Sequence, residues 1–213
     1  MKKSYFILIF IIGVIITTII MLKTRNANNY FYNKDFNIPE YISLVDKDND
    51  GVDDQSDILN NVKEYLKTKP KYKSKYYGTG YPDDEYGVCT DVVARGLFQA
   101  GYDLQKLVDT HIRNNRGLYK IDKVDSNIDF RRVRNLKVYF DNTGILLSLN
   151  PKEIDEWQGG DIVIFPNHIG IVSDKRNSKG IPYVFHHANP FQLSYEEDIL
   201  GSNYQIIGHY RIS

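Results

Sequence analysis

Cysteine is almost absent from this 213-residue sequence, in which Cys89 is the only one. A single thiol excludes an intramolecular disulfide framework and a zinc site built from several thiolates. A surplus of positive charge is also lacking, because 27 basic residues balance 27 acidic residues. The first 25 positions hold four basic residues and no acidic residue, so residues 26–213 carry 23 basic and 27 acidic residues. This mildly acidic body disfavours nucleic acid as a partner, since generic nucleic-acid binding needs clustered lysine and arginine.

A long apolar run lies at the N-terminus, where Tyr5–Leu22 holds 18 residues without charge or proline. As a helix it would span about 27 Å, close to a hydrocarbon thickness of about 30 Å. Basic residues flank it on both sides and therefore do not set an orientation. We expect residues 1–25 to be a single-pass membrane anchor with the body outside the cytoplasm, followed by a tether over 26–45. A cleaved signal segment and secretion are the alternative, although Ile19–Leu22 is bulkier than a usual cleavage site.

An acidic cluster follows between residues 46 and 57. Alternate aspartates and a glycine match a calcium-binding loop, in which several carboxylates surround one ion and the glycine permits a sharp turn. The candidate ligands are Asp46, Asp48, Asp50, Val52, Asp54 and Asp57. The spacing is closer to calcium repeats of extracellular proteins than to an EF-hand, which has glutamate at the last position. The alternative is a solvated acidic turn that caps a helix beginning near Ser56. We expect a structural calcium ion that takes no part in catalysis.

Helices are predicted in the first part of the body. Apolar residues recur at helical spacing after the acidic cluster, and Gly101 is well placed to stop a later helix. Polar residues dominate 114–150, where we expect irregular structure around one helix. The predicted helices are 58–66, 88–101, 104–113 and about 130–140.

Short β-type runs separated by turn residues follow from residue 161 onward. They cover 162–165, 168–172, 183–185 and 204–207. Helices first and antiparallel strands last predict an α+β fold, with N-terminal helices packed on a small antiparallel sheet. We expect the main domain to span 76–213, preceded by the loop and helix of 46–75.

Cys89 is placed at the predicted start of a helix. The unpaired N–H groups and partial positive charge of a helix N-terminus favour a thiolate over a thiol. Because the thiolate is the nucleophilic form, this position suits covalent catalysis. The alternative is a buried, inert cysteine, which is a common state of a single thiol.

A catalytic thiol needs an imidazole that takes its proton and a third group that orients the imidazole. His168 opens an apolar strand directly after a loop, and His186 and His187 end the next predicted strand. Strand alternation puts His186 and His187 on opposite faces, so only one can point where His168 points. Neighbouring antiparallel strands would bring that pair within about 5 Å. His111 and His209 are expected in solvated or core-edge positions, and each histidine could instead be structural.

Five short boxes of sequence carry a resemblance to a known family. They are Gly87–Val92, Asn127–Val133, Gly160–Val163, His168–Asp174 and Gly208–Arg211. In this order they resemble the domain-of-unknown-function 1287 family. A cysteine at a helix start followed by two histidine strands is similar, more broadly, to the NlpC-type papain-like cysteine peptidases, which cut peptides of the bacterial cell wall. The resemblance extends from about Tyr76 to Arg211 and implies a papain-like, NlpC-like fold.

The resemblance also implies a thiol hydrolase. Cys89 would be the nucleophile, His168 the base, and either His186 or His187 the orienting group. Backbone N–H groups at the start of the Cys89 helix would hold the oxyanion. Cys89 and His168 stand 79 residues apart, farther than in compact NlpC-type domains, so an insertion must fold aside or cover the cleft.

Charged residues within the boxes are candidates for substrate binding. Asp91, Arg131 and Arg132 could form surface ion pairs, or an arginine could meet a substrate carboxylate, since its planar fork suits that shape. Stem peptides of the cell wall are rich in carboxylates.

We therefore expect an exported, membrane-tethered, monomeric cysteine hydrolase that cleaves amide bonds in cell-wall peptides and needs no cofactor for catalysis. One alternative is a silent module of the same fold that binds wall peptides without cutting them. Another is a calcium-dependent surface interaction domain in which Cys89 is incidental.

Overall fold

The computed structural model describes residues 11–14, 16–17, 30–202 and 204–213. The chain divides into two compact units, Met1–Tyr30 and Phe31–Ser213. Residues 11–14 and 16–17 are helical and exposed, and the rest of the predicted anchor falls outside the described residues. Within the described ranges, no helix is both long enough and apolar enough to cross a membrane.

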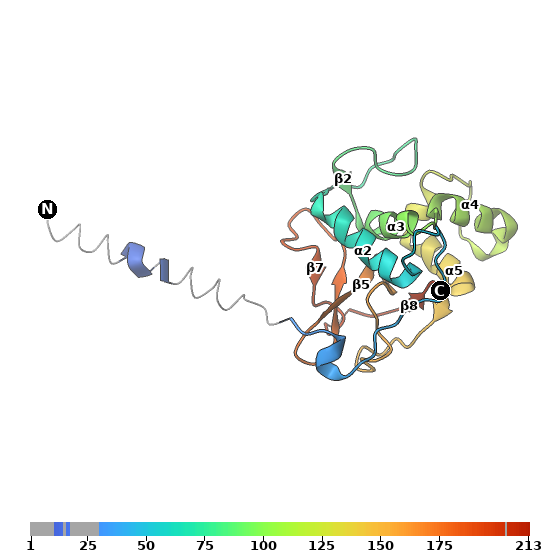
Figure 1. The fold of residues 1–213 in the computed structure, drawn as a ribbon. Coiled ribbons are helices and arrows are strands. Elements are labelled where there is room, and N and C mark those ends of the chain that lie inside the picture. The colour runs from blue at the N-terminus through green and yellow to red at the C-terminus, as the bar shows by residue number, and fades with distance from the viewer. Residues whose placement is uncertain (1–10, 15, 18–29, 203) are drawn as a thin grey trace, which may run out of the picture. The chain divides into compact units, whose positions relative to one another are not determined.

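The helices of the second unit come before most of its strands, as the sequence predicts (Figure 1). They are η1 (Asn33–Phe36), α2 (Asp54–Lys67), α3 (Cys89–Gln99), α4 (Leu104–Asn114), η2 (Arg116–Leu118), η3 (Asp129–Arg131) and α5 (Val133–Thr143).

The ends of α2 and α3 have clear local causes. The Asp53 side chain caps α2 by accepting a hydrogen bond from the N–H of Ser56 at 3.3 Å. Lys69, with φ of 53°, follows the end of this helix and precedes Pro70, which cannot continue it. Gly101 adopts φ of 80° just after α3, and it is therefore the stop that the sequence predicts.

The strands form a parallel pair and a six-stranded antiparallel sheet. The pair consists of β1 (Lys71–Tyr72) and β2 (Tyr86–Gly87). The sheet has the order β3-β8-β4-β5-β6-β7. Its members are β3 (Ile145–Leu146), β4 (Ile162–Phe165), β5 (His168–Arg176), β6 (Pro182–Phe185), β7 (Glu196–Glu197) and β8 (Gly208–Arg211). The α+β class is confirmed, but the strand predicted at 204–207 is wrong, because the last strand begins at Gly208 instead.

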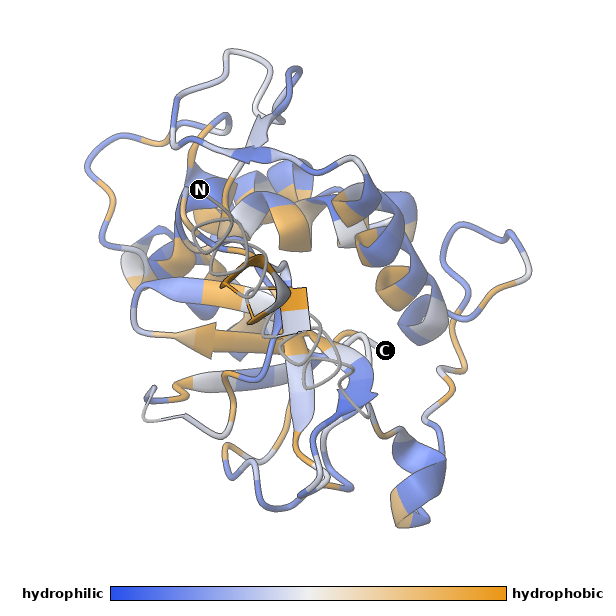
Figure 2. Cartoon of the chain, turned by 90° about the vertical axis from the view of Figure 1, so that its left-hand side faces the viewer, coloured by the Kyte–Doolittle hydropathy of each residue, from blue (hydrophilic) through white to orange (hydrophobic). Residues whose placement is uncertain are grey.

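Alternation along β4 and β5 divides the core between the two faces of the sheet. Ile164 and Ile169 are partners in the ladder and belong to the cluster that contains the apolar residues of α2 and α3. We call this side the helix face. Val163 and Val172 belong to a second cluster around Trp157, on the opposite side, which we call the loop face. Figure 2 shows that the helices carry both apolar residues, in orange, and polar residues, in blue.

The segment predicted as a tether is instead part of the second unit from Phe31 onward. Phe31 and Arg176 exchange backbone hydrogen bonds of 3.0 and 2.7 Å, which adds the segment to the end of β5. Asn33 and Ile38 are buried. The loop and helix of 46–75 also belong to this unit rather than to a separate body.

Candidate active site

Cys89 is the first residue of α3, directly after the extended residue Val88. The backbone N–H groups of Ile169 and Thr90 act on its sulfur and favour the thiolate. Thr90 belongs to the helix start, and Ile169 belongs to β5, one residue after His168. The thiol therefore lies where α3 meets the beginning of β5.

Burial dominates the acidity of this thiol. It raises the pKa of Cys89 to about 11, and the nearby charge of Asp91 acts in the same direction. The backbone hydrogen bonds oppose this rise but do not reverse it. At neutral pH the resting residue is a thiol, so nucleophilic attack requires a group that takes its proton.

His168 and His186 lie side by side, as the sequence predicts for one of the two histidines after β6. Nε2 of His168 lies 3.0 Å from Nδ1 of His186. On the far side of His186, Nε2 lies 3.2 Å from a carboxylate oxygen of Glu197. These contacts form a chain from Glu197 through His186 to His168.

The chain fixes which nitrogens carry hydrogen. An ionised Glu197 accepts a hydrogen bond from the N–H at Nε2 of His186. Nδ1 of His186 then carries no hydrogen and accepts a hydrogen bond from the N–H at Nε2 of His168. The amide nitrogen of Gln192 lies 3.4 Å from Nε2 of His186, but it is closer to the backbone carbonyls of His186 and Ser194, at 3.2 and 2.6 Å, which can accept its two hydrogens. His168 therefore presents an unprotonated Nδ1, which is a proton acceptor.

Burial keeps both imidazoles neutral. It lowers the pKa of His168 to about 4 and that of His186 to about 3, and neighbouring imidazoles add to both shifts. A neutral imidazole can accept the proton of a thiol.

His187 is on the other side of the strand end. Its ring makes edge contacts with Tyr72 and Tyr195, at centroid distances of 5.3 and 5.1 Å. Its Nδ1 is buried and has no hydrogen-bond partner among the described residues. Burial lowers its pKa. The geometry thus pairs His168 with His186 and leaves His187 beside the helix face.

The thiol and the histidine pair are not joined by a hydrogen bond. Ladder pairing with Phe165 puts His168 on the loop face, whereas Cys89 packs against the cluster of the helix face. Within the described part of the chain, no hydrogen bond joins the sulfur to an imidazole. Catalytic hydrogen bonds are often long in ligand-free enzymes and tighten when substrate binds.

A cavity of about 340 Å³ opens beside the histidine pair. Its lining includes His168, His186 and Glu197, together with the aromatic rings of Phe165 and Tyr204. Cys89 is not part of this lining. The side chains of Phe191 and Leu193, 86% and 100% exposed, flank Gln192 in the loop that follows His186. The histidine pair thus borders a hollow with apolar surface nearby.

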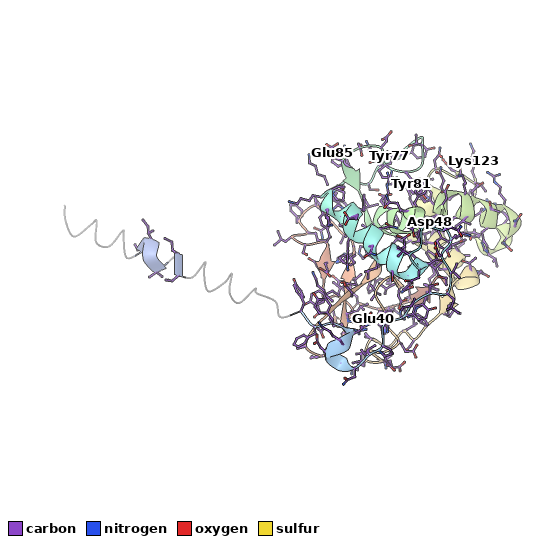
Figure 3. All side chains as sticks on the ribbon, viewed as in Figure 1. Glu40, Asp48, Tyr77, Tyr81, Glu85 and Lys123 are labelled. Atoms are coloured by element: carbon purple, nitrogen blue, oxygen red, sulfur yellow. The ribbon has the colours of Figure 1, made fainter. Side chains whose placement is uncertain are left out.

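Asp91 and Arg131 form a buried ion pair rather than a surface for substrate. The guanidinium of Arg131 donates to both oxygens of Asp91, at 2.7 and 2.8 Å. It also lies over the ring of Tyr77, which Figure 3 labels, and it donates to the carbonyl of Lys75. Both side chains are almost fully buried. The expectation that either one contacts substrate is not supported, because each satisfies the other.

Arg132 remains a candidate for binding carboxylates. Its side chain is 45% exposed, and its contact with Asp129 is long, at 3.9 Å. It borders a cavity of about 570 Å³ that is also lined by Arg113, Lys120, Lys123 and Arg134, as well as by acidic residues. This cavity contains neither Cys89 nor the histidine pair.

The acidic loop brings some of its predicted ligands together. One carboxylate oxygen from each of Asp46, Asp48 and Asp50 lies within 4.8 Å of the other two. Asp54 is turned away, because its oxygens accept hydrogen bonds from the N–H of Lys47 and the hydroxyl of Tyr102. Asp54 is therefore not placed as a direct ligand.

Two groups were missed by reasoning from sequence. Glu197 was missed because nothing in its local sequence ties it to His186 across the sheet. Asp161 was treated only as part of a matching box, but it is the centre of a buried network. It accepts hydrogen bonds from Gln55 at 2.8 Å, from Arg211 at 2.8 and 2.9 Å, and from His209 at 3.1 Å. The boxes at 160–163 and 208–211 thus meet around one buried carboxylate.

The comparisons with known proteins cover the region that contains these boxes. The family described as "Domain of unknown function (DUF1287)" matches residues 59–212. The chain is 41% identical over 154 residues to a protein of Escherichia coli (strain K12) described as "Uncharacterized protein YijF", a match that covers 67% of this chain and 72% of the relative. No solved structure matches the chain. The chain therefore belongs to the DUF1287 family.

Proposed function

We propose that the protein is a papain-like cysteine hydrolase with Cys89 as nucleophile and His168 as general base. The observation that carries this proposal is the chain from Glu197 through His186 to His168, which leaves a lone pair on Nδ1 of His168. This imidazole belongs to the residue directly before Ile169, whose backbone N–H lowers the pKa of Cys89. The proposal requires His168 and Cys89 to come together when substrate binds, because no hydrogen bond joins the two side chains in the described part of the chain.

The reaction follows from these positions. Nδ1 of His168 takes the proton of the thiol while the sulfur attacks a carbonyl carbon and a tetrahedral oxyanion forms. N–H groups at the start of α3 hold this oxyanion, a contribution of about 3 kcal/mol for each donor. When the C–N bond breaks, the imidazolium returns the proton to the leaving amine. Water, activated by the same imidazole, then hydrolyses the thioester and releases the acid and the free thiol.

The substrate class is an amide bond in a cell-wall peptide. The resemblance of the five boxes to NlpC-type peptidases supports this assignment. The basic cavity beside Arg132 offers a second contact for peptides that carry several carboxylates. In this proposal residues 1–25 anchor a monomer in the membrane with its body outside the cytoplasm, and a cleaved signal segment is the alternative.

The test is incubation of the purified full-length chain with soluble cell-wall fragments, followed by mass analysis of the products. We expect new amine and carboxyl termini with the wild-type chain, and none with Cys89→Ala or His168→Ala. Cleavage that persists at the wild-type rate in pure Cys89→Ala would overturn the proposal.

A silent peptide-binding module is the second candidate. It is favoured by the raised pKa of Cys89 and by the missing sulfur–imidazole bond. Binding of wall fragments by the wild-type chain without any cleavage would establish this alternative.

A further inference from the structure

The loop before α2 is folded so that its aspartates turn inward. Asn49 and Gly51 adopt positive φ values of 63° and 95°. Asp46 accepts hydrogen bonds from the N–H groups of Asp50 and Gly51, at 3.2 and 2.9 Å. The chain thus curls around the carboxylates of Asp46, Asp48 and Asp50, which crowd within 4.8 Å.

A further acidic residue lies in the first turn of α2, outside the three whose carboxylate oxygens lie within 4.8 Å of one another. Asp57 is only 8% exposed, and its Oδ2 is buried without a hydrogen-bond partner among the described residues. The charges of Asp50 and Asp48 act on this carboxylate. An unpaired buried carboxylate oxygen next to like charges is costly.

We propose that the loop binds one calcium ion through the carboxylates of Asp46, Asp48, Asp50 and Asp57 and the carbonyl of Val52. These residues occupy positions 1, 3, 5, 12 and 7 of a twelve-residue calcium loop, with Gly51 at the position of the turn. The donors are all oxygens, whereas zinc and copper sites are built with imidazole or thiolate. The site lies before residue 59, where the family match begins.

The ion would fix the loop against α2 and α3. A Cβ built on Gly101, in the turn after α3, would lie only 3.2 Å from Lys47 and 3.4 Å from Asp48. The hydroxyl of Tyr102 donates to Asp54, and the ammonium of Lys47 lies 5.2 Å from the centre of the Tyr102 ring. Asp48, labelled in Figure 3, therefore belongs to a loop that joins the start of α2 to the end of α3. This role does not depend on the proposed hydrolase.

The test measures calcium binding and thermal unfolding of the full-length chain after removal of metal with a chelator. Calorimetry with calcium chloride is expected to show one ion per chain with a Kd of about 0.1–1 mM or tighter, as in extracellular calcium modules. Magnesium is expected to bind more weakly, because the loop lacks a compact octahedral cage. Calcium should raise the melting temperature.

Two variants and a matched control sharpen this test. Asp57→Asn removes the buried charge but keeps its shape, so it should raise the melting temperature in chelator and abolish the calcium-induced rise. Asp48→Ala changes an exposed side chain and should weaken calcium binding by about tenfold or more without unfolding the chain. Asp83→Asn, an exposed acid outside the loop, should behave as wild type.

Three results would each overturn the calcium site. The first is no saturable heat with wild type up to about 10 mM calcium, well above the range of such modules. The second is equal affinity for magnesium and calcium. The third is wild-type calcium affinity in both loop variants.

Discussion

The tautomer of His186 decides whether His168 can act as a base. With hydrogen on Nε2, directed at Glu197, His186 accepts from His168, and Nδ1 of His168 keeps its lone pair. With hydrogen on Nδ1, His186 would donate to His168 instead. The hydrogen of His168 would then move to Nδ1, and that nitrogen could not take the proton of Cys89.

Replacement of Glu197 tests this dependence. Glu197→Gln puts an amide donor opposite Nε2 of His186 and favours the wrong tautomer, so kcat should fall by about 10²-fold, the lower end of what general-base catalysis contributes. KM for wall fragments should change little, because Glu197 acts through His186.

The neighbouring residue supplies the control. Glu196 is bonded to Ser173 and Lys175 rather than to a histidine. Glu196→Gln should therefore retain kcat, and equal losses in the two variants would contradict the role assigned to Glu197.

The alkylation rate of Cys89 should follow its raised pKa. With a pKa of about 11, the thiolate fraction near pH 7 is ~10⁻⁴, and it rises tenfold for each pH unit. Labelling by iodoacetamide, followed by mass spectrometry, should therefore be slow at neutral pH and still be accelerating above about pH 9. The chain unfolded in urea, with an ordinary thiol pKa of about 8.5, is the reference. A plateau below about pH 8 in the folded chain would instead indicate a thiolate stabilised by an imidazolium.

At the scale of elements, the close approach of β5 and β6 aligns the histidine pair. Gly170 lies between His168 and Val172 on the loop face, opposite the backbone of β6. A Cβ at this position would lie 2.5 Å from Val184 and 2.7 Å from the carbonyl of Phe185. No side chain fits there without a shift of one strand, and any shift moves His168 relative to His186.

Gly170→Ala should therefore damage stability and catalysis together. Overpacking of this kind typically costs about 1–3 kcal/mol, which is measurable by urea unfolding. Cleavage should fall further than the lost folded fraction accounts for, because the His168–His186 contact is disturbed. Gly117→Ala is the control, since nothing lies within 4 Å of its added Cβ. Similar effects of the two substitutions would contradict this role of Gly170.

Elements with strong local signals could be predicted from the sequence, and contacts between distant segments could not. The strand at 162–165 and the helix stop at Gly101 follow from apolar runs and from glycine conformation. The sequence left the partner of His168 open between His186 and His187. Strand alternation puts these two residues on opposite faces of the sheet, but it does not show which face His168 takes. The register with β4 and β6 decides this in favour of His186.

The segment predicted as a tether also shows that contacts between distant segments could not be predicted from the sequence. Residues 31–45 have little periodicity, and a loop is therefore the natural expectation. Their order depends on a pairing with Arg176, more than 140 positions away. Such a pairing leaves no mark in the local sequence.

At the scale of the whole molecule, Asp161 connects parts that carry different functions. Gln55 comes from α2, whose start borders the acidic loop, and Asp161 lies just before β4, which neighbours the strand of His168. His209 and Arg211 belong to β8, near the C-terminus. His209, expected at a core edge, is in fact fully buried and stacks on Trp157 at 3.6 Å. One carboxylate thus joins the proposed calcium-loop helix to the sheet that carries the proposed active site.

Loss of this carboxylate should destabilise the entire second unit in one transition. Asp161→Asn leaves the buried guanidinium of Arg211 without its counter-charge, and breaking a buried pair from one side costs about 3–5 kcal/mol. Asp174→Asn is the matched control, because Asp174 pairs with Lys63 at a half-exposed position, where an ion pair contributes about 1 kcal/mol or less. Urea unfolding followed by far-UV and near-UV circular dichroism should show coincident transitions, shifted strongly by the first substitution and slightly by the second. If the near-UV signal alone were lost while the helices persisted, Asp161 would hold the sheet only, and the link between α2 and the sheet would have to lie elsewhere.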